Sequence, residues 1–446
     1  MGQRQDIDFV LRTVEERDIR FIRLWFTDVL GRLKSFAISP EDLEVAFEEG
    51  IGFDGSSIEG FTMREESDVL AFPDPSTFQV LPWRPRENGV ARIFCRIFTP
   101  DRKPFPGDAR ECLRRVFYKA DEMGYIMNVG AELEYFYFPD ESTPVPLDSA
   151  GYFDLTPDDP ARDVRRSTVL MLEKMSVPVE YSFHATSPSQ QGLALRHAEA
   201  QTMSDAIMTA KYVIRLEAYE KGIHASFMPK PMASAQSSGM FLHESLFDHD
   251  GNNVFWSEED ERYHLSDIAK HYMAGILAYA PEMMAVTNPT VNSYKRLANS
   301  KGDIPTHATW GLRNRAAMIR IPTYKPGKQL ATRIELRTPD AMANPYLVCA
   351  VTLAAGLKGI QDKMELPAEA TDELLSRPSA ELERRGYTRL PRSLGEALDR
   401  FEESELMRET LGEHIHSFFL RKKRSEWEKF NAAVTDWEVK RYLANS

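Results

Sequence analysis

Residues 129–138 read VGAELEYFYF, an apolar and aromatic run interrupted by two carboxylates, Glu132 and Glu134. The two-residue period predicts a β-strand with both carboxylates on one face. Neighbouring acidic side chains suit Mg²⁺ or Mn²⁺, which prefer oxygen ligands, and such ions usually serve phosphoryl transfer. A solvated strand face is an equally good interpretation, because the spacing alone does not separate the two.

A second run, RIELR at 333–337, places Arg333, Glu335 and Arg337 on one face of a predicted strand. Three more arginines precede it, at positions 313, 315 and 320. Guanidinium groups bind carboxylates and phosphates with paired hydrogen bonds, so five arginines around one glutamate favour an anion site. For any single arginine, a cross-strand ion pair is the alternative.

The composition of the 446-residue chain narrows the class of protein. It is 42% hydrophobic and 28% charged, which predicts a soluble globular protein of two or three domains. The net charge of −13 disfavours nucleic acid as a partner. Three scattered cysteines, the absence of an apolar signal core and the absence of a run of about 20 apolar residues predict a cytoplasmic protein without disulfides or membrane spans.

Turn residues and helical periodicity divide the chain further. The polar, proline-bearing segment 100–106 suits a linker, and the residues before it are expected to form mostly short strands and turns. Helices are predicted at 109–123, 203–221, 345–361, 393–419 and 425–444. The last of these is rich in Trp and charge and is expected to dock on a neighbour.

Several ordered motifs, taken together, resemble type I glutamine synthetase over nearly the whole chain. They are FDGSSI at 53–58, GYF at 151–153, FMPKP at 227–231, NSYKRL at 292–297, NR at 314–315, IRIP at 319–322, RIELR at 333–337 and ANPYL at 343–347. The opening and residues 419–427 resemble the actinobacterial-type branch, some members of which join glutamate to amines other than ammonia.

The resemblance implies an α+β fold, with an N-terminal β-grasp-like domain at 1–103 and a catalytic domain at 104–446 built on a curved antiparallel sheet. It also implies a homo-oligomer, a dodecamer of two stacked hexameric rings. The active site would then lie between neighbours, with Asp54 and Ser57 reaching the sheet of the adjoining subunit.

The family reaction phosphorylates the γ-carboxylate of glutamate with ATP, and an amine then displaces the phosphate, with two divalent ions neutralising the transferred group. Matching positions assign Glu132, Glu134 and Glu335 to Mg²⁺ or Mn²⁺, and Glu180, His243, Ser245, Arg320 and Arg333 to ATP. They assign Ser57, Tyr152, Arg296 and Arg337 to the substrate, and Asp54, Asp303 and Arg315 to catalysis.

Three of the six metal ligands implied by the resemblance are replaced, by Ala185, Gly192 and Phe241. Metal binding is therefore expected to be weakened or absent, and ordinary glutamine synthesis lost or altered. The alternative is a non-catalytic paralogue that acts as a scaffold, a ligand sensor or a partner of an active synthetase. The pocket should be less acidic and roomier than in the family, with Arg–Glu pairing or a bound anion near Arg337.

Overall fold

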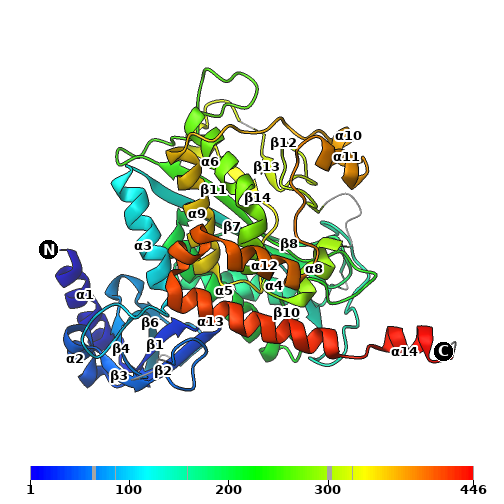
Figure 1. The fold of residues 1–446 in the computed structure, drawn as a ribbon. Coiled ribbons are helices and arrows are strands. Elements are labelled where there is room, and N and C mark those ends of the chain that lie inside the picture. The colour runs from blue at the N-terminus through cyan, green and yellow to red at the C-terminus, as the bar shows by residue number, and fades with distance from the viewer. Residues whose placement is uncertain are drawn as a thin grey trace.

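The computed structural model describes residues 2–62, 67–85, 87–157, 159–298, 304–323 and 325–444, and Figure 1 shows two bodies of unequal size. The chain opens with the helix α1 (Gly2–Glu16), although strands and turns were expected from about residue 7. In the larger body, helices cover a long curved sheet, and α13 runs along its lower edge (Figure 1).

The smaller body is a β-grasp domain around a mixed sheet of order β2-β1-β6-β4-β3, with β5 paired to β6. Its strands are β1 (Ile19–Thr27), β2 (Leu33–Ile38), β3 (Ile51–Asp54), β4 (Asp68–Pro73), β5 (Gln79–Val80) and β6 (Gly89–Phe98). The strands β1 and β6 are parallel, and α1 and α2 (Leu43–Glu49) pack nearby. The domain buries an apolar core of its own, which includes Ile22, Phe61 and Ile93.

The larger body holds a sheet of order β12-β13-β14-β11-β7-β9-β8, with β10 paired to β7. Its strands are β7 (Ile126–Phe138), β8 (Val179–His184), β9 (Gln190–Glu199), β10 (His224–Ser226), β11 (Met240–Phe247), β12 (Trp310–Leu312), β13 (Ile319–Ile321) and β14 (Ile334–Leu336). Its described pairings are antiparallel except β12 with β13. The expected curved sheet is thus confirmed, with one parallel edge.

Helices form the other layer of the larger body. The predicted helices are confirmed as α3 (Ala109–Glu122), α5 (Ala200–Glu220) and α9 (Pro345–Gln361). Because α9 is apolar on nearly all sides, it lies buried, in contact with α3, α5, α6 and α13. The remaining helices before residue 390 are α4 (Arg162–Lys174), α6 (Asp267–Ala278), α7 (Ala280–Thr287), α8 (Val291–Ala298), α10 (Asp372–Leu375) and α11 (Ser379–Arg384).

The two predicted C-terminal helices were placed wrongly. The chain forms α12 (Leu394–Glu403), α13 (Glu405–Ala432) and α14 (Asp436–Tyr442). Ser404 separates the first two because its hydroxyl accepts a hydrogen bond from the backbone N–H of Met407 and starts a new helix. Thr435 and Glu438 form a reciprocal capping box that starts α14.

Asn344 is one of the side chains that join the two bodies. The amide of Asn344 donates to the carbonyl oxygens of Asp28 (3.3 Å) and Val29 (3.2 Å), while its oxygen accepts from the backbone of Tyr346 at the start of α9. Gly31 in the β1–β2 turn has a positive φ, and a Cβ there would lie 2.9 Å from the Cα of Asn344. The turn therefore sits directly against the first residues of α9.

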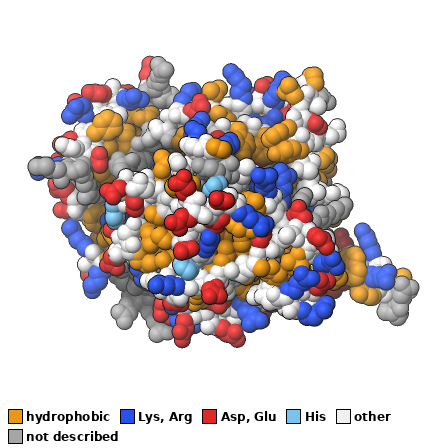
Figure 2. Space-filling model, turned by 90° about the horizontal axis from the view of Figure 1, so that it is seen from above, with side chains coloured by type: hydrophobic (Ala, Val, Ile, Leu, Met, Phe, Trp, Pro, Cys, Tyr) orange, Lys and Arg blue, Asp and Glu red, His pale blue; other side chains and the backbone are white. Residues whose placement is uncertain are grey.

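The helix α14 stands away from the body of the molecule (Figures 1 and 2). Its apolar side chains are exposed, Trp437 by 64% and Tyr442 by 57%. Trp427, near the end of α13, packs against Gly395 of α12 and is partly buried. None of the helices in the described part of the chain is long and apolar enough to cross a membrane.

Candidate functional site

A cavity of about 360 Å³ opens on the concave sheet of the larger body and collects most of the predicted site residues. It is lined, among others, by Glu132, Glu134, Tyr152, Glu180, His243, Arg296, Arg315, Arg320, Arg333, Glu335 and Arg337. Strand register brings them together, because Glu132 lies opposite Phe241, while Glu335 lies between His243 and Arg320 on its two neighbouring strands.

Some of the predicted residues lie elsewhere. Asp54 and Ser57 are exposed on the β-grasp domain and do not line this cavity, and Asp54 accepts hydrogen bonds from Ser56. Ser245 is buried in β11 outside the cavity lining. Arg313 is likewise outside it, and Asp303 lies outside the described residues.

Glu335 is the centre of an ion-pair network. Its two carboxylate oxygens accept hydrogen bonds from different guanidinium groups, those of Arg320 and Arg337. The flanking arginines hold the pKa of this carboxyl below its ordinary value against the opposing effect of burial. The predicted Arg–Glu pairing is confirmed: Arg320 pairs with Glu335 across β13 and β14, and Arg337 pairs with it from two residues along the same segment.

Phe241 takes part in the same network. The guanidinium of Arg337 lies over the Phe241 ring, 4.6 Å from its centroid, which is cation–π geometry. The Nε of Arg337 also donates to the carbonyl oxygen of Arg315 (2.8 Å). An aromatic side chain thus covers the cation at the position where the family resemblance expects a metal-binding histidine.

Phe183 fills the space beside Gly192, so the prediction of a roomier pocket is wrong on that side. A Cβ at Gly192 would overlap the Phe183 ring. The ring belongs to an aromatic wall, with centroids 5.6 Å from Tyr181 and 5.4 Å from Phe153. Tyr152 stacks on Phe153 at 4.0 Å and completes the wall. The bulky aromatic residues occupy the room that a lost carboxylate would have left.

Glu132 and Glu134 face the cavity as predicted. The hydroxyl of Tyr181 donates to Glu132 (3.2 Å), and the backbone N–H of Gly239 donates to Glu134 (2.8 Å). Burial raises the pKa of the Glu132 carboxyl to about 7, and the neighbouring Glu134 and Glu335 add to this shift. Burial also raises the pKa of Glu134. Both carboxyls thus favour the neutral form more than exposed carboxyls would.

Arg296 and Arg333 also donate hydrogen bonds within the protein. Arg296 is 2% exposed and donates to the carbonyl oxygens of Thr338 (2.5 Å), Pro339 (3.2 Å) and Arg337 (2.9 Å). Arg333 donates to the Nδ1 of His243 (3.3 Å), and burial lowers the pKa of His243 to about 3. His243 is therefore neutral at physiological pH and can accept this bond.

These residues do not fit a pair of divalent ions. In the described part of the chain, no group of three or more His, Cys, Asp or Glu residues is arranged to hold a metal ion. Both oxygens of Glu335 are engaged by arginines, and Ala185, Gly192 and Phe241 offer no oxygen or nitrogen ligand from their side chains. The arrangement can hold a small polar molecule against charged and aromatic groups, and no catalytic step through a metal follows from it.

The aromatic wall was not predicted from the sequence. Tyr181 and Phe183 stand two residues apart in the run EYSF at 180–183, which forms part of β8. Their spacing signalled that both side chains face the same side of the strand. The exposed pair Tyr152 and Phe153 gave no periodic signal, because these residues lie in a turn.

Comparison with known families identifies both bodies. The model of the glutamine synthetase β-grasp domain matches residues 18–100, and that of the glutamine synthetase catalytic domain matches residues 106–442. A glutamine synthetase of Mycolicibacterium smegmatis is 51% identical over 443 residues, covering 98% of this chain and 99% of that protein. One from Methanosarcina mazei is 46% identical over 440 residues, covering 98% of this chain and 97% of the relative.

Solved structures agree on the fold. A GmaS/ADP complex superposes with a TM-score of 0.85 at 28% identity, covering 97% of this chain and 99% of that one. A ligand-free GmaS structure gives a TM-score of 0.84 at 29% identity with the same coverage.

Proposed function

The chain belongs to the glutamine synthetase family, and from that premise we propose that it is a non-catalytic, ligand-binding member that no longer forms glutamine. The observation that carries the proposal is the engagement of Glu335 by Arg320 and Arg337, with Phe241 covering Arg337. A metal at this position would have to displace two charge-assisted pairs without gaining the ligands needed to replace them.

This proposal changes what is expected of the family's metal ions and of ATP. Binding of Mg²⁺ or Mn²⁺ is weakened or absent, because half of the expected ligands are missing. ATP binding is still supported by Glu180, His243, Arg320 and Arg333, which line the cavity, although Arg320 is occupied by Glu335. Tyr152 and Arg315, at the rim, are the residues proposed to meet a small substrate-like molecule.

A second function is an ATP-dependent γ-glutamyl ligase with an altered amine substrate. The fold similarity to GmaS and the retention of nucleotide-side residues in the cavity favour it. The family reaction is then kept, with a changed metal requirement, and Arg296 and Arg337 would hold the glutamate. The structure around Arg296 disfavours glutamate binding by this residue, because its guanidinium is buried and bound to three carbonyl oxygens.

The assembly proposed for either function is a homo-oligomer, with two stacked rings of six as in the family. Domains divide at about residue 103, and Asp54 and Ser57 would reach a neighbouring subunit's cavity, since they are exposed and do not line their own. The exposed apolar side chains of α14 would be buried between subunits. A cytoplasmic location follows from the family resemblance and the reduced cysteines. Light scattering at micromolar concentration tests the assembly, and a monomer would contradict it.

The decisive experiment measures ATP consumption with glutamate and a panel of amines, including ammonium and methylamine, in Mg²⁺ and separately in Mn²⁺. We expect no turnover above background with any amine. The variant Arg333→Gln serves as the matched control, because an intrinsic activity should fall in it and a contaminant's activity should not. Turnover of about 1 s⁻¹ or more that falls in this variant would overturn the non-catalytic proposal. If that turnover required an organic amine, it would establish the ligase.

Restoring metal ligands gives an independent test. Ala185→Glu alone should leave Mn²⁺ binding undetectable by electron paramagnetic resonance, because the other vacancies remain. A combined variant, Phe183→His with Ala185→Glu, Gly192→Glu and Phe241→His, should bind Mn²⁺. Binding by the unmodified protein with a micromolar dissociation constant would refute the proposal.

A further inference from the structure

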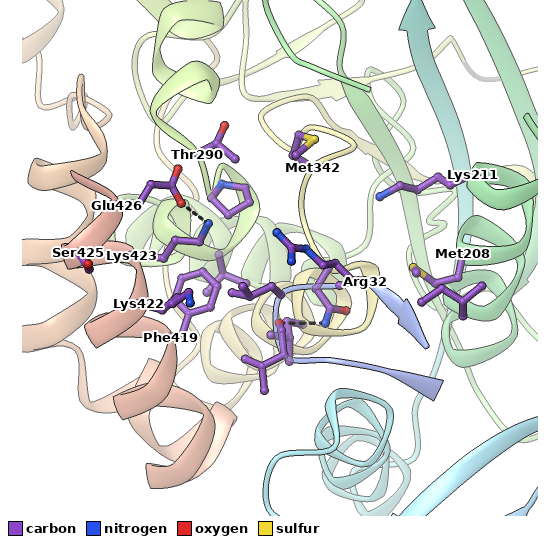
Figure 3. Close-up of a pocket in the computed structure, with 18 of the residues that line it drawn as sticks. Arg32, Met208, Lys211, Thr290, Met342, Phe419, Lys422, Lys423, Ser425 and Glu426 are labelled. Carbon is purple, nitrogen blue, oxygen red and sulfur yellow. Dashed lines mark hydrogen bonds and ion pairs between the residues drawn. The ribbon is translucent and has the colours of Figure 1, made fainter. Parts of the chain in front are cut away.

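A second cavity, of about 770 Å³, lies where the β-grasp domain meets the catalytic domain (Figure 3). Its walls come from the β1–β2 turn, from α5 and α13, and from the segments 286–290 and 342–347. It is larger than the cavity on the concave sheet and shares no lining residue with it. We call it the interdomain cavity.

The interdomain cavity is strongly cationic. Glu426 is the one carboxylate among its lining residues, all of which are described. Its cationic lining residues are Arg32, Lys211, Arg215, Lys422, Lys423 and Lys429. The chain as a whole has a net charge of −13, so this concentration of positive charge is opposite in sign to the charge of the whole molecule. Low-dielectric walls make such a concentration costly unless anions offset it.

Two of these cations form ion pairs with carboxylates, and the other four form none with any described residue. Lys422 pairs with Glu59 (2.6 Å) and Lys423 with Glu426 (2.8 Å). The side chain of Arg32 forms no hydrogen bond or ion pair with any described residue, and the same holds for Lys429. The guanidinium of Arg215 lies over the ring of Phe227, 5.0 Å from its centroid. Much of the donor capacity of the cavity is therefore available to a ligand.

Lys211 is the most deeply placed of the four. It is 7% exposed, and its ammonium group donates to the carbonyl oxygen of Ala341 (2.5 Å). Burial lowers the pKa of Lys211 to about 7, and the nearby Arg215 adds to this shift. Figure 3 shows Lys211 and Arg32 directed into the cavity from different sides. A bound anion would add negative charge beside this buried ammonium, which has Asp340 as a charged neighbour on the protein side.

We propose that the interdomain cavity binds a small organic polyanion carrying two or more phosphate or carboxylate groups. Arg32 would hold it from the β-grasp side, and Lys211 with Arg215 from the catalytic side. Met208, Met342 and Phe419 line the same space and accommodate a carbon skeleton. Because the ligand contacts both domains, it fixes the β1–β2 turn against α5 and stabilises the whole chain.

Titration calorimetry of the full chain tests the proposal, with pyrophosphate, ADP and citrate as probes and EDTA present to remove metals. At least one probe should bind with a dissociation constant below about 100 μM and should bind more weakly as salt increases. Arg32→Gln, Arg215→Gln and Lys211→Met should each weaken binding at least about tenfold. Lys119→Gln, on an exposed part of α3, should leave the binding of every probe unchanged, and Arg333→Gln, in the other cavity, should leave the binding of pyrophosphate and citrate unchanged.

Two outcomes would overturn the proposal. One is the absence of binding by all three probes at about 1 mM. The other is binding that survives Arg32→Gln and Arg215→Gln but is lost in Arg333→Gln, which would place the anion on the concave sheet. Arg32 and Arg215 are exposed, so these two variants test the proposal without any change to the buried Lys211. The result is independent of glutamine formation, so the two proposals can fail separately.

Discussion

The two cavities of this protein hold similar numbers of cationic side chains and use them in opposite ways. On the concave sheet, five arginines share the space with Glu132, Glu134, Glu180 and Glu335, and four of these arginines donate at least one hydrogen bond within the protein. In the interdomain cavity, six cations face one carboxylate. A count of basic residues therefore does not identify an anion site. The number of donors that remain without a protein partner is the better guide.

The largest expected effect comes from breaking the network on the concave sheet. Glu335→Gln removes the carboxylate shared by Arg320 and Arg337 and leaves two cations uncompensated, which should lower the free energy of unfolding by about 3 kcal/mol. Urea unfolding measures the change. Glu373→Gln is the matched control, since it removes an exposed pair with Arg377 and should cost less than about 0.5 kcal/mol.

Glu335→Gln also tests how the engaged arginines affect anion binding on the concave sheet. If engaged arginines are what prevents anion binding on the concave sheet, Glu335→Gln should create a new pyrophosphate site there, detectable by calorimetry. Arg337 would then be free to bind the anion. An unchanged stability together with no new binding would show that the pairing does not govern this cavity.

A smaller effect is expected from crowding the aromatic wall. Gly192→Ala places a methyl group in space that the Phe183 ring already occupies, and should cost about 1–3 kcal/mol. In a double-mutant cycle, Gly192→Ala should lower the free energy of unfolding much less in the Phe183→Ala background than in the unmodified protein. Gly52→Ala, where the nearest neighbour is 3.7 Å away, should change little. Additive costs would contradict direct packing of the two residues.

In the interdomain cavity, removal of a charge should stabilise the protein. Lys211→Met removes a buried ammonium whose charged neighbours are Arg215 and Asp340, with Arg32 across the cavity. We expect a gain on the order of 1 kcal/mol in the free energy of unfolding at pH 7, reduced by the lost bond to Ala341. Thermal unfolding with and without pyrophosphate measures the gain, and ligand stabilisation should disappear in the variant.

The sign of the pH dependence follows from the lowered pKa of Lys211, about 7 in the folded protein against 10.5 for a free lysine. Between these values the unfolded chain binds more protons than the folded one, so stability rises with pH. The destabilisation caused by the buried Lys211 ammonium is largest below pH 7 and decreases toward pH 10.5. The advantage of Lys211→Met should therefore narrow over this range, whereas the exposed-site variant Lys119→Met should show no such trend.

The smallest effect should come from Phe241. Phe241→Leu keeps the apolar volume and removes the ring beneath Arg337, which should cost about 0.5–1 kcal/mol. A double-mutant cycle with Arg337→Gln isolates this contribution from that of Glu335. A coupling energy close to zero would mean that the ring merely fills space.

The sequence predicted the site through strand periodicity. The two-residue spacing in 129–138 placed Glu132 and Glu134 on one strand face, and that in 333–337 did the same for Glu335 and Arg337; the structure shows that both faces line one cavity. Register across strands was not readable from the sequence, so Arg320 as a partner of Glu335 came only with the structure, whereas Arg337 was already expected on the same strand face. The helix break at Ser404 was missed because hydrophobic periodicity continues through it, while a single hydroxyl decides where the next helix starts.

The interdomain cavity could not be predicted, for a related reason. Its cations come from three distant segments, and each of them looks like an ordinary solvated charge in its own helix or turn. Arg32 becomes part of a site because Gly31 lets the β1–β2 turn approach Asn344, and that approach is a tertiary contact. Local sequence patterns carry no information about which distant segments contact each other in the folded chain.

The contact between Phe183 and Gly192 also limits the order in which mutations can act on this protein. A carboxylate at position 192 cannot return while the Phe183 ring occupies the same space, and replacing Phe183 first opens a hole in the aromatic wall. Each of these two single changes thus destabilises the fold. A carboxylate at position 192 requires that both residues change together, which makes the pair a barrier to stepwise substitution.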